Sequence, residues 1–419
     1  MGGTELMPVA PAGERSALPV LVPEAHAIGT IAVIRSLGRA GYPVHACAAD
    51  RDALGLVSNY AAAGVVCPPY GDAAFLPWLA EYVAVHRIAA IIPSEGFLLG
   101  IRPVFDRYAR LLPIPSDSGV VYRNLSKAAV FGHLAKHPDA AAHLPPTLIF
   151  DGEDAPAARA FDALDLPIFV KADAADANAA GAASRVIRAD SIDAARQAVS
   201  ELRAGFSRVL AQGFVPGQGA GAYFLVDEGG IVQEFANRCL HEIPHTGGFC
   251  SLRESWWNEA MMEDARAKLR HLDWKGVAML EYRWDPRSRT FHFIELNARF
   301  WAALHLALFA GVDFPRMLLD RFHGFAVQRT SFPVGLQCRL TVHDIGYVAS
   351  RWRDPALGLA AKLASAGGWM ARCFDPRIRS DLWFPHDSHL YWRQWGVFLR
   401  NALARVRRMT SSTDPASTR

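Results

Sequence analysis

Short apolar runs alternate with stretches of helical periodicity over the first hundred residues of the chain. The runs have the length of buried strands, and the stretches between them repeat apolar residues every three to four positions. Alternating strands and helices of this size predict a parallel sheet with helices on both faces. We therefore predict a Rossmann-like α/β domain over residues 17–115. Its predicted strands are 17–22, 44–49 and 89–95, and its predicted helices are 28–40 and 72–86.

The pattern changes after Phe150, where strand-like runs are separated by turns. Helices are predicted in this part only near 192–204 and 254–272, and an apolar helix follows the last strands. This texture is α+β rather than strictly alternating, and it predicts an α+β domain over 116–328. The remaining predicted parts are a C-terminal extension at 329–408, whose role the pattern does not indicate, and flexible tails at 1–16 and 409–419.

The segment from Gly276 to Phe300 has the pattern of a β-hairpin. Two apolar runs flank a turn at 286–289, and pairing them about this turn places Glu281 opposite Glu295. Because side chains alternate along a strand, one face of the hairpin is apolar and the other polar. The apolar face is predicted to hold Ala278, Leu280, Tyr282, Ile294, Leu296 and Ala298, and the polar face Glu281, Arg283, Glu295, Asn297 and Arg299.

Two carboxylates that face each other across a hairpin repel unless a cation lies between them. Mg²⁺ accepts carboxylate and amide oxygens and shares its coordination shell with substrate phosphates, so the pair predicts a magnesium site. Asn297, two residues after Glu295, supplies a third oxygen. The alternative is that Arg283 and Arg299 pair with the two glutamates on a solvated sheet face.

Two lysines and a turn add to this pattern. Lys171 ends an apolar strand, and Lys127 begins a predicted helix some forty residues earlier. Lysine is a mobile point charge that suits phosphate oxygens, although solvation is the ordinary role of a single lysine. The stretch 208–219, RVLAQGFVPGQG, is an apolar strand that runs into a Gly/Pro turn. It is read either as a hinge beside an adenine ring or as an ordinary β-turn.

Together these features resemble the ATP-grasp superfamily, and within it the biotin carboxylase and carbamoyl phosphate synthetase branch and predicted carboxylate–amine ligases. The resemblance covers residues 20–325 and implies a nucleotide held between two α+β subdomains, with ATP and two Mg²⁺ ions, or Mn²⁺, as cofactors. It implies that Lys127 and Lys171 contact phosphates, that Gln212, Gly213, Phe214 and Val215 hold the adenine, that Glu281, Glu295 and Asn297 bind the metal, and that Arg299 stabilises the transferred phosphoryl group with Lys171.

Two stretches depart from the family pattern. The lid after the second lysine is usually rich in glycine, but here 172–184 reads ADAADANAAGAAS. Glycine approaches phosphates closely because it has no Cβ, so alanine weakens that contact or shifts it to side chains such as Asn178. The carboxylate that often holds the ribose after the hinge would fall near Gly219, which has none.

The segment 237–255 is similar to a loop that predicted ligases of this group carry near their acceptor site. Its candidate substrate or phosphate contacts are Arg238, His241, Glu242, Gly247 and Gly248. His241 to His245 also match the His-Glu-x-x-His zinc motif, which needs a helix to place both histidines on one face. Pro244 and the two glycines oppose a helix, so we interpret the motif as loop. Cys250, although near His245 in sequence, is interpreted as a buried free thiol.

Charge and cysteine content limit the partners and the compartment. Lys and Arg number 44 against 41 Asp and Glu, which gives a net charge of +3. A surface this nearly balanced has no strong positive field to attract a polyanion, so we expect no nucleic-acid partner. Six scattered cysteines do not form a disulfide framework, and a cytoplasmic location is expected. We expect small-molecule substrates, a carboxylate and a nucleophile, and the oligomeric state stays open.

The C-terminal stretch 390–409 predicts a basic amphipathic helix, with tryptophans and leucines set against arginines. Packing of its apolar side on its own domain is the favoured interpretation. The alternative is peripheral contact with an anionic membrane surface.

The features together predict an ATP-grasp ligase that activates a carboxylate as an acyl phosphate for attack by an amine or another nucleophile. One alternative is an ATP-dependent carboxylase or carbamoylating enzyme that works through carboxyphosphate. Another is a nucleotide-binding regulatory or scaffold protein without turnover, which the alanine-rich lid and Gly219 suggest and the intact Glu281 to Arg299 pattern opposes.

Overall fold

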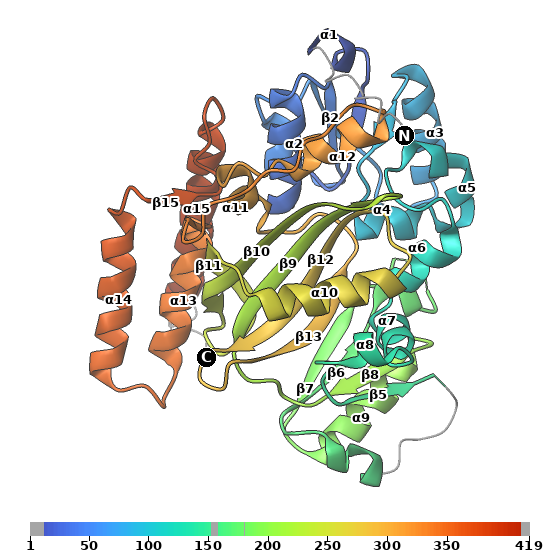
Figure 1. Cartoon of the computed structure of the whole chain (residues 1–419). Coiled ribbons are helices and arrows are strands. Elements are labelled where there is room, and N and C mark those ends of the chain that lie inside the picture. Colours follow the sequence, from blue (N-terminus) through green and yellow to red (C-terminus); the bar gives the residue numbers. More distant parts are fainter. Residues whose placement is uncertain (1–11, 152–157, 180, 412–419) are drawn as a thin grey trace, which may run out of the picture.

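The computed structural model describes residues 12–151, 158–179 and 181–411, which form three β-sheets with helices packed against them (Figure 1). A parallel sheet lies near the N-terminus, a small antiparallel sheet follows it, and a seven-stranded, mostly antiparallel sheet forms the centre of the molecule. The mixture of α/β and α+β elements predicted from the sequence is therefore present.

The N-terminal sheet has the strand order β3-β2-β1-β4, and all neighbours are parallel. Its strands are β1 (Val20–Val22), β2 (Val44–Ala48), β3 (Ala63–Val66) and β4 (Ala90–Ile91), and its longer helices are α2 (Ile28–Arg39) and α3 (Phe75–Val85). Because β2 and β4 flank β1 on opposite sides, the chain leaves the carboxyl ends of β1 and β4 in diverging directions. Such a point in a parallel sheet opens a crevice for a ligand.

Short helices link this sheet to the next part of the chain. They are α4 (Glu95–Gly100), α5 (Phe105–Tyr108), α6 (Ser118–Asn124), α7 (Lys127–Leu134) and α8 (Pro138–Ala141). Helix α7 begins where the sequence predicted, because Ser126 caps it by accepting a hydrogen bond from the backbone N–H of Ala129 at 3.1 Å. The cap fixes Lys127 in the first turn.

The small antiparallel sheet has the order β5-β8-β6-β7. Its strands are β5 (Thr147–Phe150), β6 (Ile168–Ala172), β7 (Arg185–Ala189) and β8 (Val209–Gln212), and α9 (Ile192–Arg203) packs on it. The apolar side of α9 buries Val199 and Leu202 against the sheet. Lys171 lies near the end of β6, and Gln212 ends the neighbouring strand β8.

The central sheet has the order β13-β12-β9-β10-β11-β14-β15. Its long strands are β9 (Gln218–Asp227), β10 (Gly230–Ile243), β11 (Phe249–Ser255), β12 (Gly276–Asp285) and β13 (Thr290–Asn297), with β14 (Gln337–Arg339) and β15 (Ile378–Ser380) at one edge. Helix α10 (Glu259–His271) lies across it. The predicted start of this helix at residue 254 is wrong, because residues to Ser255 pair in β11 and Asn258 caps the helix.

The parallel sheet and the central sheet share one hydrophobic core. Val20 and Val44 of the N-terminal sheet belong to the same buried cluster as Tyr223 of β9 and Trp301 after β13. Helices α11 (Leu304–Phe309) and α12 (Phe314–Phe322) pack against α2 within this cluster. The packing holds the crevice of the N-terminal sheet close to the end of β13.

Part of the predicted N-terminal tail is structured. Residues 1–11 lie outside the described part, but Ala12–Arg15 form α1, and the Arg15 guanidinium binds both carboxylate oxygens of Asp320 in α12, at 2.8 and 2.9 Å. A two-pronged ion pair with a buried carboxylate accounts for the order of residues that the composition alone assigned to a tail.

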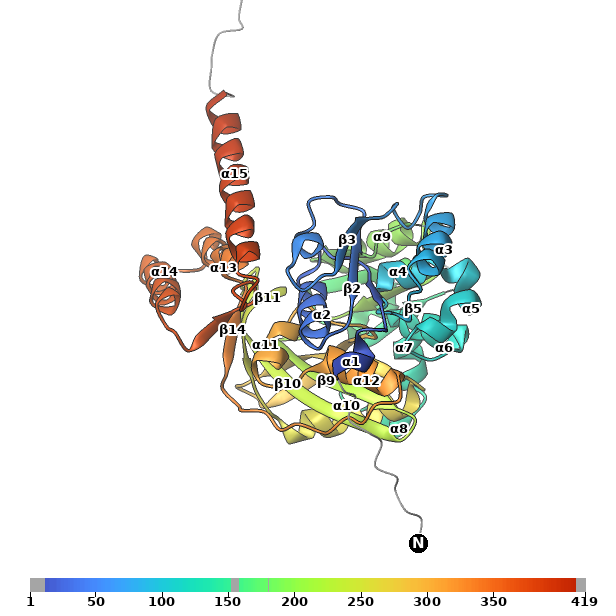
Figure 2. The same ribbon diagram turned by 90° about the horizontal axis from the view of Figure 1, so that it is seen from above.

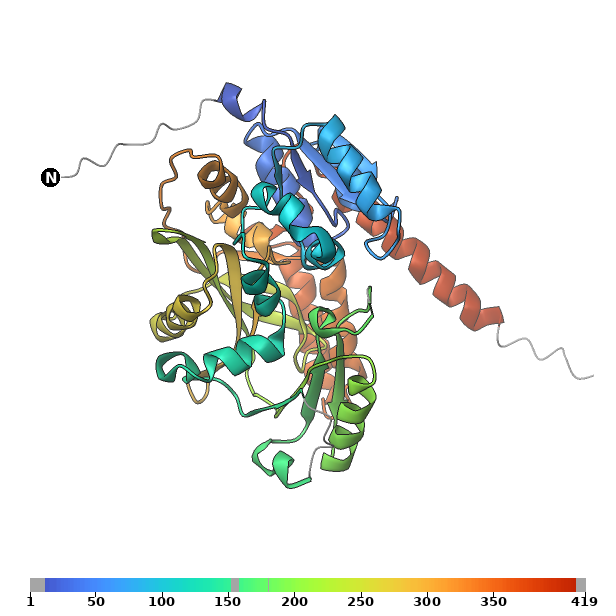
Figure 3. The same cartoon turned by 90° about the vertical axis from the view of Figure 1, so that its right-hand side faces the viewer.

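The C-terminal extension contains strands β14 and β15 and the helices α13 (Thr341–Arg353), α14 (Leu359–Cys373) and α15 (His389–Ser411). The fully buried Arg35 of α2 anchors it by donating to Asp387 Oδ2 and to the Asp381 carbonyl, each at 2.7 Å. Beyond Leu390, α15 extends away from the rest of the molecule (Figures 2 and 3). None of the helices in the described ranges has the length and apolar character needed to cross a bilayer.

The favoured interpretation of the C-terminal helix, packing on its own domain, is wrong for the apolar residues Trp392, Leu399 and Leu403. Leu390 is buried, but Trp392 and Leu403 are each 61% exposed. The reason is geometric, since the helix continues past the body that would have covered its apolar side.

Candidate functional site

The β12–β13 hairpin places Glu281 directly opposite Glu295, as the sequence predicted. Between Glu281 and Tyr282 the register shifts, so that Tyr282 pairs with Phe293 and Ile294 is the extra residue of a β-bulge. The prediction that Ile294 lies on the apolar face is therefore wrong, and Phe293 takes the buried position. The bulge leaves the two glutamates on one face of the sheet.

Lys127 comes to this face from the N-terminus of α7. Its Nζ lies 3.3 Å from Glu295 Oε2 and 2.8 Å from Asp173 Oδ1. Burial opposes the lysine charge, but the carboxylates of Glu295 and Asp173 outweigh it and raise the pKa of Lys127 above its ordinary value. Lys127 therefore stays cationic beside the glutamate pair.

Lys171 approaches the pair from the small sheet. Its Nζ donates to Gln212 Oε1 at 2.7 Å, and burial lowers the pKa of this lysine. Burial and the charge of Glu295 raise the pKa of Glu281, whereas Lys127, Asn297 and Lys171 together outweigh burial and lower the pKa of Glu295. Two lysines from one side and two glutamates from the other thus meet between the small sheet and the central sheet.

The residues on this face fit a divalent cation shared with a phosphate. Asn297 donates its Nδ2 to Glu295 Oε1 at 2.8 Å, which leaves its Oδ1 as a third hard oxygen. Within the described residues, no three His, Cys, Asp or Glu side chains gather as a self-sufficient metal site would require. Mg²⁺ commonly takes one or two carboxylates and completes its shell with substrate phosphates, and Glu281 and Glu295 supply this number.

The predicted hinge, residues 212–215, follows β8. Gln212 is buried and links Lys171 to Thr147, whose Oγ1 accepts from Gln212 Nε2 at 3.0 Å. Gly213 lies so close to the backbone of Asp165 that an added Cβ would come within 2.6 Å of its N, and the Phe214 N–H donates to the Asp165 carbonyl at 2.9 Å. The hinge is thus held through its backbone at Gly213 and Phe214, and Val215 follows it in the connection to β9.

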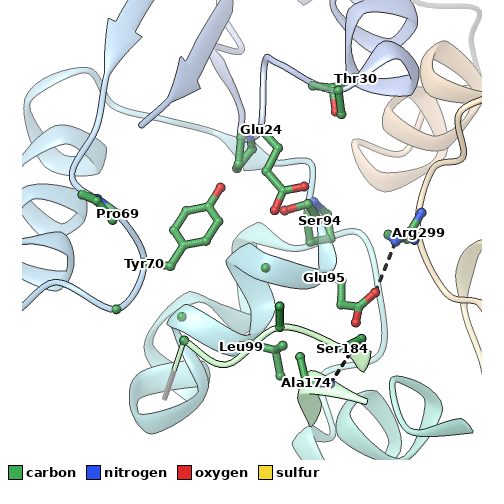
Figure 4. Close-up of a pocket in the computed structure, with 18 of the residues that line it drawn as sticks. Glu24, Thr30, Pro69, Tyr70, Ser94, Glu95, Leu99, Ala174, Ser184 and Arg299 are labelled. Atoms are coloured by element: carbon green, nitrogen blue, oxygen red, sulfur yellow. Dashed lines mark hydrogen bonds and ion pairs between the residues drawn. The ribbon is translucent and has the colours of Figure 1, made fainter. Parts of the chain in front are cut away.

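A cavity of about 1090 Å³ opens beside this face, at the carboxyl ends of β1 and β4 (Figure 4). Its walls also include Arg299, just after β13, and most of the alanine-rich segment 174–184. Arg299 Nε lies 3.5 Å from Glu95 Oε2. The polar residues Glu24, Tyr70, Ser94 and Glu95 of this cavity were missed from the sequence. The signal for Glu24, Ser94 and Glu95 was their place at the ends of the predicted strands 17–22 and 89–95 of a parallel sheet. Tyr70 had no such signal, because it follows β3, which was not predicted.

Solved structures of known proteins share this fold. Biotin carboxylase of Campylobacter jejuni, in a β-γ-ATP complex, superposes with a TM-score of 0.57 at 19% identity, over 76% of this chain and 74% of that one. N5-carboxyaminoimidazole synthetase of Staphylococcus aureus superposes with a TM-score of 0.56 at 11% identity, over 75% of this chain and 80% of that one. L-amino acid ligase of Bacillus licheniformis superposes with a TM-score of 0.50 at 15% identity, over 74% of each chain.

The chain has the ATP-grasp fold. This confirms the fold predicted from the lysines, the hinge and the glutamate hairpin. The sequence itself matches no protein-family model and no curated protein. At these levels of identity the similarity establishes the fold alone, so the roles of the residues rest on the geometry described above.

The predicted substrate loop, residues 237–255, is mostly strand of the central sheet, and only residues 244–248 form a turn. Residues up to Ile243 belong to β10, and the chain returns in β11 from Phe249. Arg238 donates to Glu254 at 2.7 Å, and His241 bonds to Asp344 at 2.8 Å, so both are engaged away from the glutamate pair. The His-Glu-x-x-His sequence is not helical, as predicted, but its first half is strand, so the interpretation as loop is wrong there.

Glu242 and the glycines after it lie nearer to the site. Glu242 Oε1 accepts from Arg283 Nη1 at 2.6 Å and from the backbone N–H of Gly219 at 3.3 Å. Gly247 borders the same Arg283 guanidinium, and Gly248 turns back over Ile243. A carboxylate therefore does reach Gly219, although it comes from β10 and not from the residue after the hinge.

Cys250 forms a disulfide with Cys239 across the β10–β11 hairpin, so its interpretation as a free thiol is wrong. The register of β10 and β11 shifts between Cys239, which pairs with Arg253, and Glu242, which pairs with Cys250. The Cα atoms of the two cysteines lie 5.7 Å apart, within the usual range for a disulfide. Disulfides persist mainly in oxidising compartments. The bond therefore gives no support to the expected cytoplasmic location, which stays a prediction.

Proposed function

We propose that this protein is a Mg²⁺·ATP-dependent ligase that activates a carboxylate as an acyl phosphate for attack by an amine or another nucleophile. The observation that carries the proposal is the meeting of Lys127 and Lys171 with the in-register pair Glu281 and Glu295. Lysines provide the charge that phosphate oxygens need, and paired carboxylates on a β-hairpin provide the ligands that Mg²⁺ needs.

In this proposal the nucleotide lies between the small sheet and the central sheet. Backbone groups of the hinge, residues 212–215, contact the adenine, and Gln212 orients Lys171 through the 2.7 Å hydrogen bond. Glu242, which reaches the backbone of Gly219, supplies the carboxylate expected near the ribose. Glu281, Glu295 and Asn297 hold one or two Mg²⁺ ions, which when bound neutralise charge on the phosphates.

The transferred phosphoryl group would pass toward Arg299, which lies two residues after Asn297 and borders the cavity. A substrate carboxylate oxygen attacks the γ-phosphorus, and the bond to ADP breaks. The nucleophile then attacks the acyl carbon, its proton is lost, and phosphate leaves. Arg299 and Lys171 offset the negative charge that moves during the first step, in a site that the alanine-rich segment helps to shield from water.

Calorimetry of Mg²⁺·ATP binding tests the nucleotide site. Wild type is expected to bind, whereas Glu281→Gln/Glu295→Gln and Lys171→Ala are expected to lose at least tenfold in affinity. Glu263→Gln on the exposed side of α10 and the exposed Lys136→Ala are matched controls that should bind as wild type does. Tight binding by the double variant, with all proteins shown to be folded, would exclude the glutamate pair as the metal site.

A second candidate keeps the fold but uses bicarbonate as the carboxylate, so that carboxyphosphate is the intermediate. It is favoured by the biotin carboxylase neighbour and by a 2-oxoglutarate carboxylase domain from Hydrogenobacter thermophilus solved with MgADP and bicarbonate, at 16% identity and a TM-score of 0.54. Phosphate release stimulated by bicarbonate alone would favour this candidate. Release that needs an organic carboxylate and an amine would favour the ligase.

A further inference from the structure

The cavity at the carboxyl ends of β1 and β4 is lined by groups of opposite charge. The loop after β1 brings Glu24, and the loop after β4 brings Ser94 and Glu95, which Figure 4 shows between Glu24 and Arg299. Arg299 enters from just after β13, next to the glutamate hairpin. A small molecule that carries groups of both charges therefore finds a partner for each in this cavity.

The Glu24 carboxylate is held in place without a counter-charge. Glu24 has a left-handed backbone, φ 58°, and its Oε1 rests so near Gly96 that an added Cβ there would come within 2.4 Å. No Lys, Arg or His of the described residues lies within ion-pair distance of it. A strained residue that presents an unpaired carboxylate to a cavity is typical of a binding site.

The neighbours of Glu24 favour a donor-rich cation over a metal. Tyr70 and Ser94 line the cavity beside it, and Val33, Leu76 and Leu99 add apolar surface. Burial, and next to it the Glu24 charge, raise the pKa of Tyr70, so that its phenol stays neutral and polar. A carboxylate with hydroxyl groups on an apolar wall suits an ammonium group, which makes several hydrogen bonds and also carries carbon substituents.

The part of the cavity beside Arg299 is suited to a carboxylate. Arg299 Nε lies 3.5 Å from Glu95, a longer contact than that of a tight pair, and the guanidinium borders the cavity. Arg102 donates to the Ala175 carbonyl at 2.9 Å and so fixes the start of the alanine-rich wall. A carboxylate placed at Arg299 lies on the side of the cavity where the phosphoryl group would arrive.

We propose that the cavity binds a small amino acid-like molecule, with its ammonium group at Glu24 and its carboxylate toward Arg299. The proposal rests on the proposed function and names the carboxylate substrate within it. An ammonium group that is paired with Glu24 keeps its proton and cannot attack, so this molecule is the carboxylate that is phosphorylated and a second substrate supplies the nucleophile. Glu24 is then a residue that determines specificity.

Calorimetry on the full chain tests this directly, with acids that differ only in the amino group. The probes are glycine, β-alanine, aspartate, glutamate, leucine and phenylalanine, each compared with the same acid lacking its amino group. At least one amino acid is expected to bind ten times more tightly than its deaminated partner, and Glu24→Gln should remove that difference. Glu81→Gln, an exposed position on α3, is the matched control and should keep it.

The outcomes separate this proposal from the proposed function. Equal binding of an acid and its deaminated partner to wild type, or binding by none of the probes, would overturn the ammonium assignment. Mg²⁺·ATP binding by Glu24→Gln within twofold of wild type is expected and shows that the variant is folded. If Mg²⁺·ATP fails to bind wild type, the ligase proposal falls, while the amino acid titrations still report on the cavity.

A second inference rests on the uncovered helices of the C-terminal extension. In α15, Trp392, Leu399 and Leu403 are all more than half exposed and, at spacings of seven and four, lie on one side of the helix. Helix α14 has no buried residue, and its exposed Leu359 and Leu363 likewise share a side. Apolar stripes of this kind are normally covered by a partner or a membrane.

The charge of α15 favours a membrane over a second copy of the chain as the surface that covers the apolar stripe. Residues 388–411 contain five arginines and no aspartate or glutamate. Two copies of such a helix repel each other, whereas an anionic lipid surface attracts it, and tryptophan suits the boundary between headgroups and acyl chains. The helix also extends clear of the body, as Figure 2 shows, so it can lie along a flat surface.

We infer that α15 docks the protein on an anionic membrane surface, with Trp392, Leu399 and Leu403 in the headgroup region. In flotation with vesicles, full-length protein is expected to bind phosphatidylcholine with 30% phosphatidylglycerol at least ten times better than phosphatidylcholine alone. Trp392→Asp/Leu403→Asp should lose this binding, and Val66→Asp, an exposed apolar position on β3, should keep it.

Two results would overturn the membrane assignment. One is no binding to anionic vesicles at low salt. The other is a dimer, seen by light scattering, that the Trp392→Asp/Leu403→Asp variant abolishes, which would assign the stripe to a second copy of the chain.

Discussion

Glu281 and Glu295 lie in register on neighbouring strands, and burial together with the charge of Glu295 raises the pKa of Glu281. At neutral pH the folded protein without metal therefore holds a proton on Glu281 that the unfolded chain releases. Since an acid with a raised pKa favours unfolding above its ordinary pKa, Glu281 costs stability as pH rises from about 4.5. Its presence in the fold is best explained by a bound cation.

Glu281→Gln is predicted to stabilise the metal-free protein and to abolish Mg²⁺·ATP turnover. Replacing the buried acid by a neutral amide removes the cost of holding its proton, for an expected gain of about 1–3 kcal/mol at pH 7. Urea unfolding in the presence of EDTA measures the gain, with Glu263→Gln as control. If the variant were no more stable than wild type, the prediction that the buried Glu281 costs stability would be wrong.

His305 is predicted to make the protein acid-sensitive. The ring is fully buried, with Nε2 3.0 Å from Arg35 Nη1 and Asp381 on the other side, and burial lowers its pKa to about 3. The unfolded chain takes up a proton near pH 6.5 and the folded one does not. Stability is therefore complete above pH 6.5 and falls between 6.5 and 3, with a slope of up to about 1.4 kcal/mol per pH unit.

Urea unfolding at pH 7.5 and pH 5 measures this loss in wild type and in His305→Gln, whose amide can accept the Arg35 hydrogen bond. The variant should lose less stability on acidification. The slope of its unfolding free energy against pH should be smaller by up to about 1.4 kcal/mol per pH unit, the contribution of one proton. His26→Gln, on the exposed surface, is the control and should follow wild type. Parallel curves for wild type and His305→Gln would show that His305 is not the group responsible.

A buried ion pair beneath the hairpin is predicted to be essential for stability. Lys268 is fully buried in α10 and binds both oxygens of Asp264, at 2.6 and 2.7 Å, and Tyr282 of β12 donates to the same carboxylate at 2.7 Å. Asp264→Asn leaves the lysine charge without compensation and should cost about 3–5 kcal/mol. Tyr282→Phe removes one hydrogen bond and should cost about 1 kcal/mol.

Chemical denaturation of these variants, with Glu263→Gln on the same helix as control, gives the comparison. The double replacement Asp264→Leu/Lys268→Met should recover most of the loss, since it removes both charges together. If Asp264→Asn cost no more than Tyr282→Phe, the lysine would have found another partner.

The site residues that the sequence identified were those on regular elements with local patterns. The register of Glu281 and Glu295 followed from alternation and the turn, and Lys127 from a helix start with a serine cap. The bulge at Ile294 was not predictable in this way, because it depends on packing of Phe293 against α7. Periodicity fixes the face of a strand only until a bulge intervenes.

Contacts between distant parts of the chain were beyond sequence reasoning. Glu24 and Arg299 border one cavity, although 275 positions separate them, because β1 and the end of β13 meet through tertiary packing. Glu242 reaches Gly219 because β10 lies beside β9, and Cys239 reaches Cys250 across the irregular register of β10 and β11, which no local pattern displays. The attachment of the C-terminal extension was likewise not predictable, because Arg35, which anchors it, lies more than 350 residues from Asp387.

Gly29 is predicted to be required where α2 meets the end of the central sheet. A Cβ at Gly29 would lie 2.3 Å from the Trp301 carbonyl oxygen, and Trp301 follows Arg299 by two residues. Gly29→Ala should therefore push this backbone away, costing about 1–3 kcal/mol of stability and lowering turnover more than tenfold by displacing Arg299.

Gly132→Ala in α7, whose Cβ would meet Ile149 at an ordinary 3.5 Å, is the matched control and should stabilise by up to about 1 kcal/mol. Thermal unfolding and phosphate release on both variants decide the matter, because full activity in Gly29→Ala would mean that the position of Arg299 does not depend on this contact.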